Sequence, residues 1–365
     1  MNTTFNIAPG IGGLTPYVPG KPVSELEREL DIYDSVKLAS NENPLGPSPL
    51  VTEALKDELH ELSRYPDGGG FALRGRLSER HLIGDERITL GNGSNDVLDM
   101  IARVFLWPGR EAVMSEHAFA VYPISSQAVG ATIRVAPARD YGHDLAAMRA
   151  LVGEDTGVVF IANPNNPTGT WLRRGELRDF LDDLPAHVVA VVDEAYTEYV
   201  DEPDYPDASE WLDELPNLIV TRTFSKAWGL AGLRVGYALS SLEIADLLNR
   251  VRQPFNVNLL AQLAAGFALD DEAHMREGVS FNACGMGQIV SGVHALGLDY
   301  IPSVGNFLCV DVGRDAAEVD QALLREGVIT RPVANYGLPR HLRVSIGMPE
   351  ENARFLEALE KVLST

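Results

Sequence analysis

The chain has 365 residues, of which 45% are hydrophobic and 22% charged, and this composition is typical of a globular protein and excludes disordered and fibrous classes. Acidic residues outnumber basic residues by 52 to 30, and the resulting net charge of −22 disfavours binding to nucleic acid. No apolar run reaches the roughly 18 residues of a membrane helix, and the N-terminus lacks the pattern of a signal peptide. We therefore expect a cytoplasmic protein of two to three domains.

The numbers of cysteine, histidine and lysine residues limit the kinds of site that the chain can form. Two cysteines cannot form a disulfide framework, and neither they nor the eight histidines show metal-ligand spacing, so we expect no metal. The acidity fits either a solvated surface encoded by a GC-rich gene or adaptation to high salt, and the sequence leaves both open. Few side chains can serve as a catalytic amine, because the lysines are only Lys21, Lys37, Lys56, Lys226 and Lys361.

The first 45 residues are rich in Gly and Pro, and we predict irregular structure there apart from a short helix at 23–31. From about residue 50, short apolar runs alternate with helical periodicity, as at 94–106 and 174–184. Continuously apolar strands separated by helices indicate an open, largely parallel α/β sheet. The predicted strands are 87–91, 111–115, 132–136, 157–163, 188–194, 218–224 and 234–240.

A second α/β pattern follows residue 240. We predict a long helical region over 241–297 that is broken near Pro254, and then a smaller domain. Its predicted elements are a strand at 306–312, a helix at 315–326, a strand at 341–347 and a helix at 349–363. The irregular N-terminus has nothing else to pack on, so we assign 46–250 to a large domain and 1–45 plus 251–365 to the N-terminal arm and small domain.

Ligands of open parallel sheets bind at the carboxyl ends of the strands, so the residues there are the candidate site. The turn Gly93–Asn95 leads from a strand into a helix, which either binds a phosphate through free backbone N–H groups or merely connects the two elements. In ANPNNPTGT (162–170), two Asn-Pro steps form a rigid turn that either presents the amide of Asn166 to a ligand above the sheet or is purely structural.

Asp193 ends a strongly apolar strand, and Tyr196 lies three residues later. A carboxylate at the end of a buried strand is costly unless a cation pairs with it. The alternative interpretation is that Asp193 is a helix N-cap.

Lys226 lies between two strands in LIVTRTFSKAWGLAGLRVGY (218–237), with hydroxyls at Thr223 and Ser225 and a cation at Arg234. Partial burial there lowers the pKa of an amine, and a neutral amine can form a Schiff base with an aldehyde. The alternative is an ordinary surface lysine. Together, these groups fit a ligand that carries a phosphate, an aldehyde, a basic ring nitrogen and a phenolic oxygen. Pyridoxal 5'-phosphate has all four.

The chain resembles the fold-type I pyridoxal-phosphate aminotransferases over nearly its whole length, from about Tyr17 to Arg343, and more closely their histidinol-phosphate-like branch. The shared motifs occur in the family's order, and they are SNENPLGPSP, RYPDGGG, GNGSND, HAFAVYP, NPNNPTG, VVDEAY, TFSKAWGLAGLRVG and HLRVSIG. The resemblance implies a large cofactor domain with a mostly parallel sheet and a smaller α/β C-terminal domain.

The resemblance also implies roles for single residues. Lys226 would hold the cofactor and move the substrate proton, and Asp193 would keep the ring nitrogen protonated. Asn166 and Tyr196 would bind the phenolic oxygen, and Tyr122 would stack on the ring. The phosphate would be held by Gly93, Ser94, Asn95, Thr223, Ser225 and Arg234, with Tyr65 reaching the cofactor of the other subunit in a homodimer.

For substrates, the resemblance implies amine exchange between glutamate and histidinol phosphate in histidine biosynthesis, with ping-pong kinetics. Arg343 would pair with the substrate carboxylate, because a guanidinium matches it with two parallel hydrogen bonds. Tyr17 and Arg331 would help it recognise both glutamate and a phosphate ester, and Asn43 would line the entrance. The alternative is that Tyr17 and Asn43 only pack the N-terminal arm. An aromatic amino acid aminotransferase and a phosphothreonine decarboxylase on the same scaffold remain open.

Overall fold

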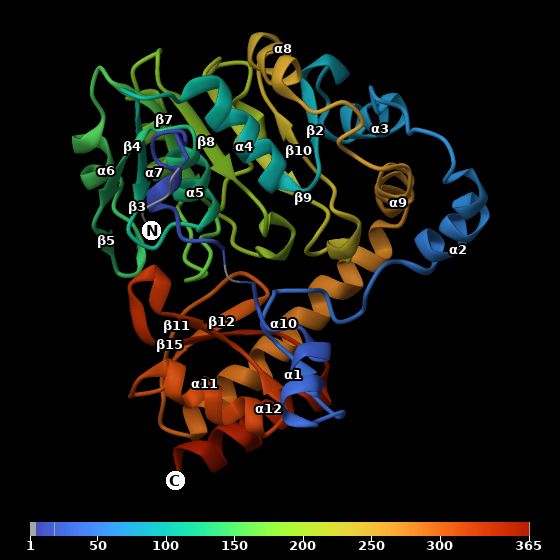
Figure 1. Cartoon of the computed structure of the whole chain (residues 1–365), viewed down its shortest axis with the longest axis vertical. Coiled ribbons are helices and arrows are strands. Elements are labelled where there is room, and N and C mark those ends of the chain that lie inside the picture. The colour runs from blue at the N-terminus through green and yellow to red at the C-terminus, as the bar shows by residue number, and fades with distance from the viewer. Residues whose placement is uncertain (1–4, 18, 365) are drawn as a thin grey trace.

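Seven strands form the larger of the two main sheets in a computed structural model that describes residues 5–17 and 19–364 (Figure 1). Their order is β2-β10-β9-β8-β7-β3-β4, and only β10 runs antiparallel to its neighbours. The predicted strands and the largely parallel sheet are confirmed. The strands are β2 (Ile88–Gly91), β3 (Glu111–Ser115), β4 (Thr132–Ala136), β7 (Thr156–Ala162), β8 (Val189–Asp193), β9 (Leu218–Thr223) and β10 (Gly236–Leu239).

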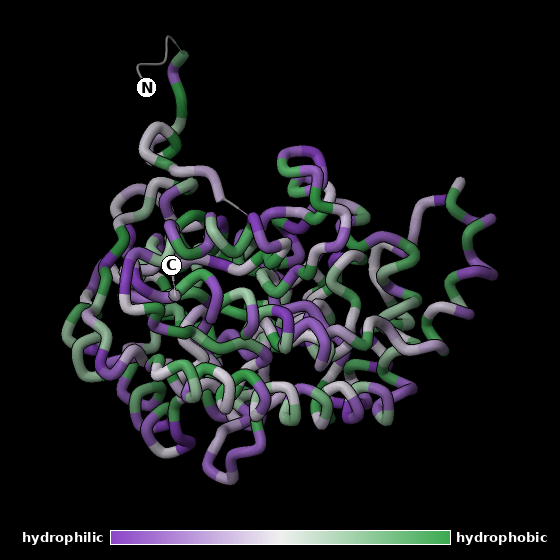
Figure 2. Tube along the Cα trace, turned by 90° about the horizontal axis from the view of Figure 1, so that it is seen from below, coloured by the Kyte–Doolittle hydropathy of each residue, from purple (hydrophilic) through white to green (hydrophobic). Residues whose placement is uncertain are grey.

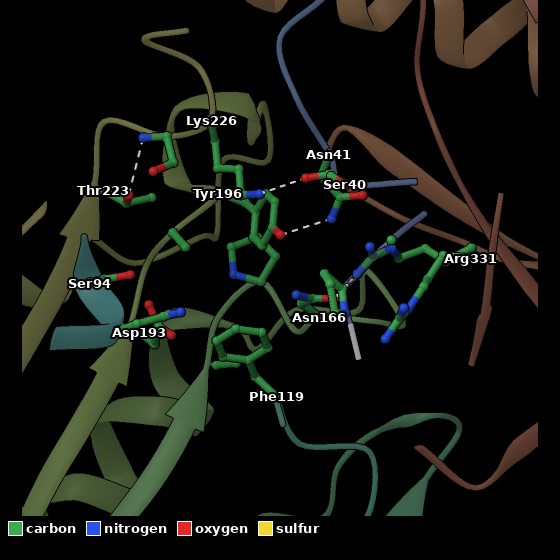
Figure 3. Close-up of a pocket in the computed structure, with 18 of the residues that line it drawn as sticks. Ser40, Asn41, Ser94, Phe119, Asn166, Asp193, Tyr196, Thr223, Lys226 and Arg331 are labelled. Carbon is green, nitrogen blue, oxygen red and sulfur yellow. Dashed lines mark hydrogen bonds between the residues drawn. The ribbon is translucent and has the colours of Figure 1, made fainter. Parts of the chain in front are cut away.

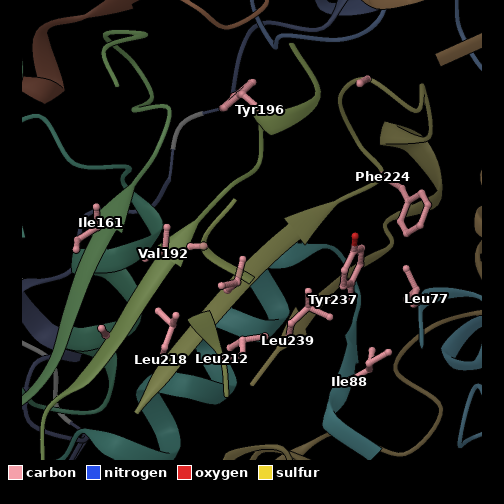
Figure 4. Close-up of a cluster of buried hydrophobic side chains, with 14 of the residues drawn as sticks. Leu77, Ile88, Ile161, Val192, Tyr196, Leu212, Leu218, Phe224, Tyr237 and Leu239 are labelled. Carbon is pink, nitrogen blue, oxygen red and sulfur yellow. The ribbon is translucent and has the colours of Figure 1, made fainter. Parts of the chain in front are cut away.

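Helices cover both faces of this sheet, which explains why its strands are continuously apolar. On one face, Val158 and Val191 pack with α4 (Ser94–Phe105), α5 (Val121–Ala128) and α8 (Leu242–Val251). On the other face lie Ile161 and Val192 (Figure 4). That second core includes side chains from α3 (Phe71–His81), α6 (Leu145–Leu151), α7 (Arg174–Asp182) and α9 (Leu259–Asp270).

The smaller main sheet is antiparallel, in the order β11-β12-β15-β14. Its strands are β11 (Asp299–Ile301), β12 (Phe307–Asp311), β14 (Arg331–Val333) and β15 (Leu338–Ser345). Core side chains from α10 (Glu272–Ala295), α11 (Ala316–Arg325) and α12 (Pro349–Leu363) pack against it. The strands and helices predicted after residue 300 are therefore confirmed, and β11 and β14 are additional.

Residues 23–37 of the N-terminal part join the smaller sheet region, whereas Gly10 lies against α5 of the larger part, where its carbonyl oxygen accepts from Gln127 Nε2 at 3.0 Å. Strand β1 (Val36–Lys37) pairs in parallel with β13 (Val328–Ile329), and α1 (Val23–Leu30) confirms the predicted short helix. Before α1, the first described residues project from the body of the molecule (Figure 2). The remaining elements are α2 (Pro49–Glu58) and the small hairpin of β5 (Ala138–Arg139) and β6 (Gly142–His143).

The region predicted as one broken helix contains three helices. The break near Pro254 is confirmed, and a second break falls at Asp271, the N-cap of α10. Helix α9 contributes four buried alanines to the core of the larger sheet. We therefore propose that the boundary between the two parts lies after α9 instead of at residue 250. No helix among the described residues is long and apolar enough to span a membrane.

Candidate active site

A cavity of about 200 Å³ lies at the carboxyl ends of β7, β8 and β9, facing the smaller sheet (Figure 3). Most of the predicted site residues line it, although they come from distant parts of the chain. From the larger part come Ser94, Asn95, Tyr122, Asn166, Asp193, Tyr196, Thr223, Ser225, Lys226 and Arg234, and on the other side lie Tyr17, Arg331 and Arg343. Gly93, Asn43 and Tyr65 are predicted site residues that do not line it.

One end of the cavity is built to hold an anion. Helix α4 begins at Ser94, so its free backbone N–H groups and its positive dipole end face this region. Gly93 has a φ of 78°, and a Cβ there would lie 2.5 Å from the Nη2 atom of Arg234. Arg234 Nη1 donates to the Ser225 hydroxyl at 3.3 Å. The glycine thus lets a guanidinium approach the start of the helix.

Lys226 lines the cavity, and its Nζ atom donates to the Ser40 carbonyl oxygen at 3.0 Å (Figure 3). Burial, together with the positive charge of Arg343, lowers the pKa of this amine to about 7. The predicted lowering of the pKa is confirmed. Near neutral pH a large fraction of Lys226 is therefore uncharged and nucleophilic.

Asp193 ends β8 as a buried carboxylate with two hydrogen-bond donors. Its Oδ1 atom accepts from the Thr221 hydroxyl at 2.9 Å, and its Oδ2 atom accepts from the Tyr122 hydroxyl at 2.7 Å. Burial raises the pKa of Asp193, whereas these two hydrogen bonds oppose that rise. Asp193 is not a helix N-cap, because the next helical turn has Tyr196 at that position.

The predicted stacking role of Tyr122 is wrong. Its ring lies parallel to Phe160, with 4.8 Å between ring centroids, and it is fully buried. Its hydroxyl is bound to Asp193. The aromatic ring of this segment that faces the cavity is Phe119, which the sequence reasoning missed (Figure 3). Phe119 and Tyr122 lie three residues apart, and Tyr122 lies on the buried side of α5.

Arg343 and Asn166 meet across the boundary between the two sheets. Arg343 Nη1 donates to Asn166 Oδ1 at 2.6 Å, and Arg343 Nη2 donates to the Ala39 carbonyl oxygen at 2.7 Å. The buried Nε atom of Arg343 has no hydrogen-bond partner among the described residues. Since a buried guanidinium N–H group requires an acceptor, this donor points to a ligand.

A second arginine lies on the neighbouring strand. Arg331 on β14 pairs in register with Arg343 on β15, and its guanidinium lies over the Tyr17 ring at 5.8 Å from the centroid. Two guanidinium groups and a half-exposed phenol therefore line the same side of the cavity. Such a pair can bind more than one kind of anion.

Asn43 does not line the entrance. It is buried, and its Nδ2 atom donates to the Ala227 carbonyl oxygen at 2.9 Å. Asn41 has a left-handed backbone with a φ of 55°, and Ser40 and Asn41 reach the cavity instead. These two residues were missed, although they belong to the SNENPLGPSP motif that was singled out.

Tyr65 lies away from the cavity, as a residue that serves another subunit would. Its side chain is 82% exposed, and its ring stacks on Phe255 with 4.7 Å between centroids. Its role across an interface stays a prediction.

Comparison with known proteins agrees with this site. The family described as aminotransferase class I and II matches residues 33–359. The histidinol-phosphate aminotransferase of Sinorhizobium meliloti, solved in complex with pyridoxal-5'-phosphate, superposes with a TM-score of 0.90 at 28% identity, covering 100% of this chain and 98% of that one. The fold is therefore that of a fold-type I aminotransferase.

Similar sequences show to which family of aminotransferases the chain belongs. Histidinol-phosphate aminotransferase 2 of Pseudomonas fluorescens is 61% identical over 358 residues, which cover 98% of this chain and 97% of the relative. The protein of the same name from Methylococcus capsulatus is 59% identical over the full length of both chains. The chain belongs to the histidinol-phosphate aminotransferase family.

Proposed function

We propose that the protein is a pyridoxal-phosphate-dependent histidinol-phosphate transaminase. It exchanges an amino group between glutamate and 2-oxoglutarate on one side and histidinol phosphate and imidazole-acetol phosphate on the other. One observation supports this proposal most directly. A single cavity combines an amine of lowered pKa, a buried carboxylate, an anion-binding helix start and two adjacent arginines.

The residues present fit pyridoxal phosphate. Its phosphate matches the start of α4 together with Arg234, and its aldehyde matches the Lys226 amine. The buried Asp193 carboxylate suits a protonated ring nitrogen, and the Phe119 ring suits one face of the pyridine. When bound, the cofactor supplies the electron sink that lets a proton leave the substrate carbon.

The protein's own groups then handle binding and proton transfer. Lys226 has a pKa of about 7, so its amine can both accept and return a proton near neutral pH. Asp193 holds its negative charge in place through the hydrogen bonds from Thr221 and Tyr122. Tyr196 and Asn166 line the cavity, and their hydroxyl and amide would bind the phenolic oxygen.

Substrate recognition follows from the two arginines. The Nε atom of Arg343, without a partner in the described structure, and an Nη atom can together bind the glutamate carboxylate with two parallel hydrogen bonds. Histidinol phosphate lacks that carboxylate, and its phosphate ester would bind the same Arg343 with help from Arg331 and Tyr17. The side-by-side placement of the two arginines supports this dual use.

We further propose that the active unit is a homodimer in which Tyr65 reaches the cofactor phosphate of the other subunit. Exposed apolar side chains are candidates for an interaction surface. Leu59, Leu62, Tyr65, Phe71 and Phe255 are all exposed, and Tyr65 stacks on Phe255. Sedimentation equilibrium measures the assembly directly. A stable, fully active monomer would contradict this part of the proposal.

The function is tested by single-turnover absorbance measurements. Cofactor-loaded enzyme is mixed separately with histidinol phosphate, phenylalanine and phosphothreonine, and release of carbon dioxide is followed in parallel. Fast conversion with histidinol phosphate alone supports the proposal. Faster conversion of phenylalanine would indicate an aromatic aminotransferase, and carbon dioxide release from phosphothreonine would indicate a decarboxylase. A protein that takes up no pyridoxal phosphate would refute the whole class.

A further inference from the structure

Three consecutive residues of an irregular segment bind three side chains of the site (Figure 3). The carbonyl oxygen of Ala39 accepts from Arg343, and that of Ser40 accepts from Lys226. Next, Asn41 Nδ2 donates to the hydroxyl oxygen of Tyr196 at 2.9 Å. The first two contacts use the backbone, which any residue supplies. The third depends on the side chain of Asn41.

The surrounding hydrogen bonds fix the orientation of the Asn41 amide. The backbone N–H of Asn41 donates to Ser345 Oγ at 2.7 Å, and Ser345 Oγ donates to Asn41 Oδ1 at 3.0 Å. With the amide oxygen bound to the Ser345 hydroxyl, the amide nitrogen lies against the Tyr196 hydroxyl. Asn306 also donates to the Asn41 carbonyl oxygen, and the whole group is buried.

This contact decides where the proton of Tyr196 can point. A phenol has one O–H donor, and its oxygen here accepts from Asn41, so the hydrogen must be directed elsewhere. Tyr196 lines the cavity, which leaves the cavity as the direction for donation. Burial raises the pKa of Tyr196 to about 12, whereas the hydrogen bond from Asn41 lowers it. Asn41 therefore makes Tyr196 a better donor.

We propose that Asn41 is a positioning residue that directs the Tyr196 proton toward the phenolic oxygen of the bound cofactor. The proposal rests on the proposed function, because it needs pyridoxal phosphate in this cavity. A strong donor at that oxygen stabilises its negative charge. The nitrogen that joins the cofactor to Lys226 then holds its own proton less tightly.

The test is a pH titration of the absorbance of the cofactor-loaded enzyme. Asn41→Gly removes the amide, and glycine tolerates the φ of 55° at this position. We expect the midpoint to rise by up to about one pH unit, which is a tenfold change in the protonation equilibrium and the scale of one lost hydrogen bond. Asn43→Ser is the matched control, because Asn43 lies in the same segment and binds only backbone. It should leave the midpoint unchanged.

A double-mutant cycle separates positioning from general loosening of the segment. In a Tyr196→Phe background, Asn41→Gly should no longer move the midpoint, because the proton that it directs is absent. Ser345→Ala serves as a second probe if Asn41→Gly folds poorly, and it should move the midpoint in the same direction by less. An unchanged midpoint in either variant, or an equal shift in the Tyr196→Phe background, would overturn the inference. Failure of the wild type to bind the cofactor would instead refute the proposed function.

Discussion

Replacement of Arg343 by lysine should weaken glutamate binding while leaving the cofactor in place. In the structure, Arg343 gives one N–H each to Asn166 and Ala39, and its Nε–H remains for a ligand. A carboxylate that takes Nε–H and a second N–H forms two charge-assisted hydrogen bonds, of which an ammonium can keep one. The lost bond is worth about 1.5–3 kcal/mol, so glutamate should bind about 10- to 150-fold more weakly.

The assay is the glutamate half-reaction, with the saturation constant taken from single-turnover absorbance changes at increasing glutamate. Arg340→Lys is the matched control, since Arg340 lies on the same strand but is exposed and pairs with Asp311. Histidinol phosphate should lose less affinity than glutamate, because Arg331 also faces its phosphate. An unchanged saturation constant for glutamate, or an equal loss in Arg340→Lys, would refute the assignment of the carboxylate to Arg343.

Four further predictions concern the cofactor residues. Lys226→Ala should remove the cofactor's lysine-dependent absorbance and at least ~1000-fold of the rate, and substantial residual transamination would exclude its role. The pKa of Lys226 is about 7 in the folded protein against 10.5 in the unfolded chain, so the unfolded chain binds more protons in this window. The free energy of unfolding of the cofactor-free protein should therefore increase as pH rises from 7 to 10.5. In urea unfolding, Lys226→Met should show a smaller increase over this range, and an increase equal to that of the wild type would contradict the prediction. Asp193→Asn should still bind the cofactor but slow the half-reactions about 100-fold, the scale of one charge-assisted hydrogen bond, and a normal rate would contradict its pairing with the ring nitrogen. Gly93→Ala should displace Arg234 and weaken cofactor binding about tenfold in equilibrium dialysis, whereas Gly75→Ala, where the added methyl meets open space, should not.

The sequence predicted the larger sheet well because each of its strands is a short apolar run covered on both faces. It did not predict that β10 runs antiparallel, since hydrophobic periodicity carries no information on strand direction. It also did not show where α9 packs. The alanines of α9 are small and weakly patterned, and only the tertiary structure places them against the larger sheet.

Within the site, the residue types were easier to predict than their orientations. Asp193 ends one buried strand and Lys226 follows another, so the carboxyl edge of the sheet fixes their location. Phe119 and Tyr122 share one aromatic segment, and the start of α5 decides which ring faces the cavity. Likewise, the left-handed turn at Asn41 decides which asparagine of the NEN sequence reaches the site. Such a turn leaves no reliable pattern in one sequence, because left-handed residues other than Gly are uncommon even though Asn is enriched among them.

The site also gives the molecule an uneven electrostatic field. Arg234, Arg331, Arg343 and Lys226 line the cavity with one carboxylate, Asp193, among the described lining residues, in a chain of net charge −22. Anionic ligands are therefore repelled at long range and attracted only near the mouth. Dissolved salt screens exposed charges separated by more than about 8–10 Å far more than it screens contacts inside the cavity. Moderate ionic strength thus lowers the outer barrier and keeps most of the inner attraction, so capture of phosphorylated ligands by this protein favours salt over dilute buffer.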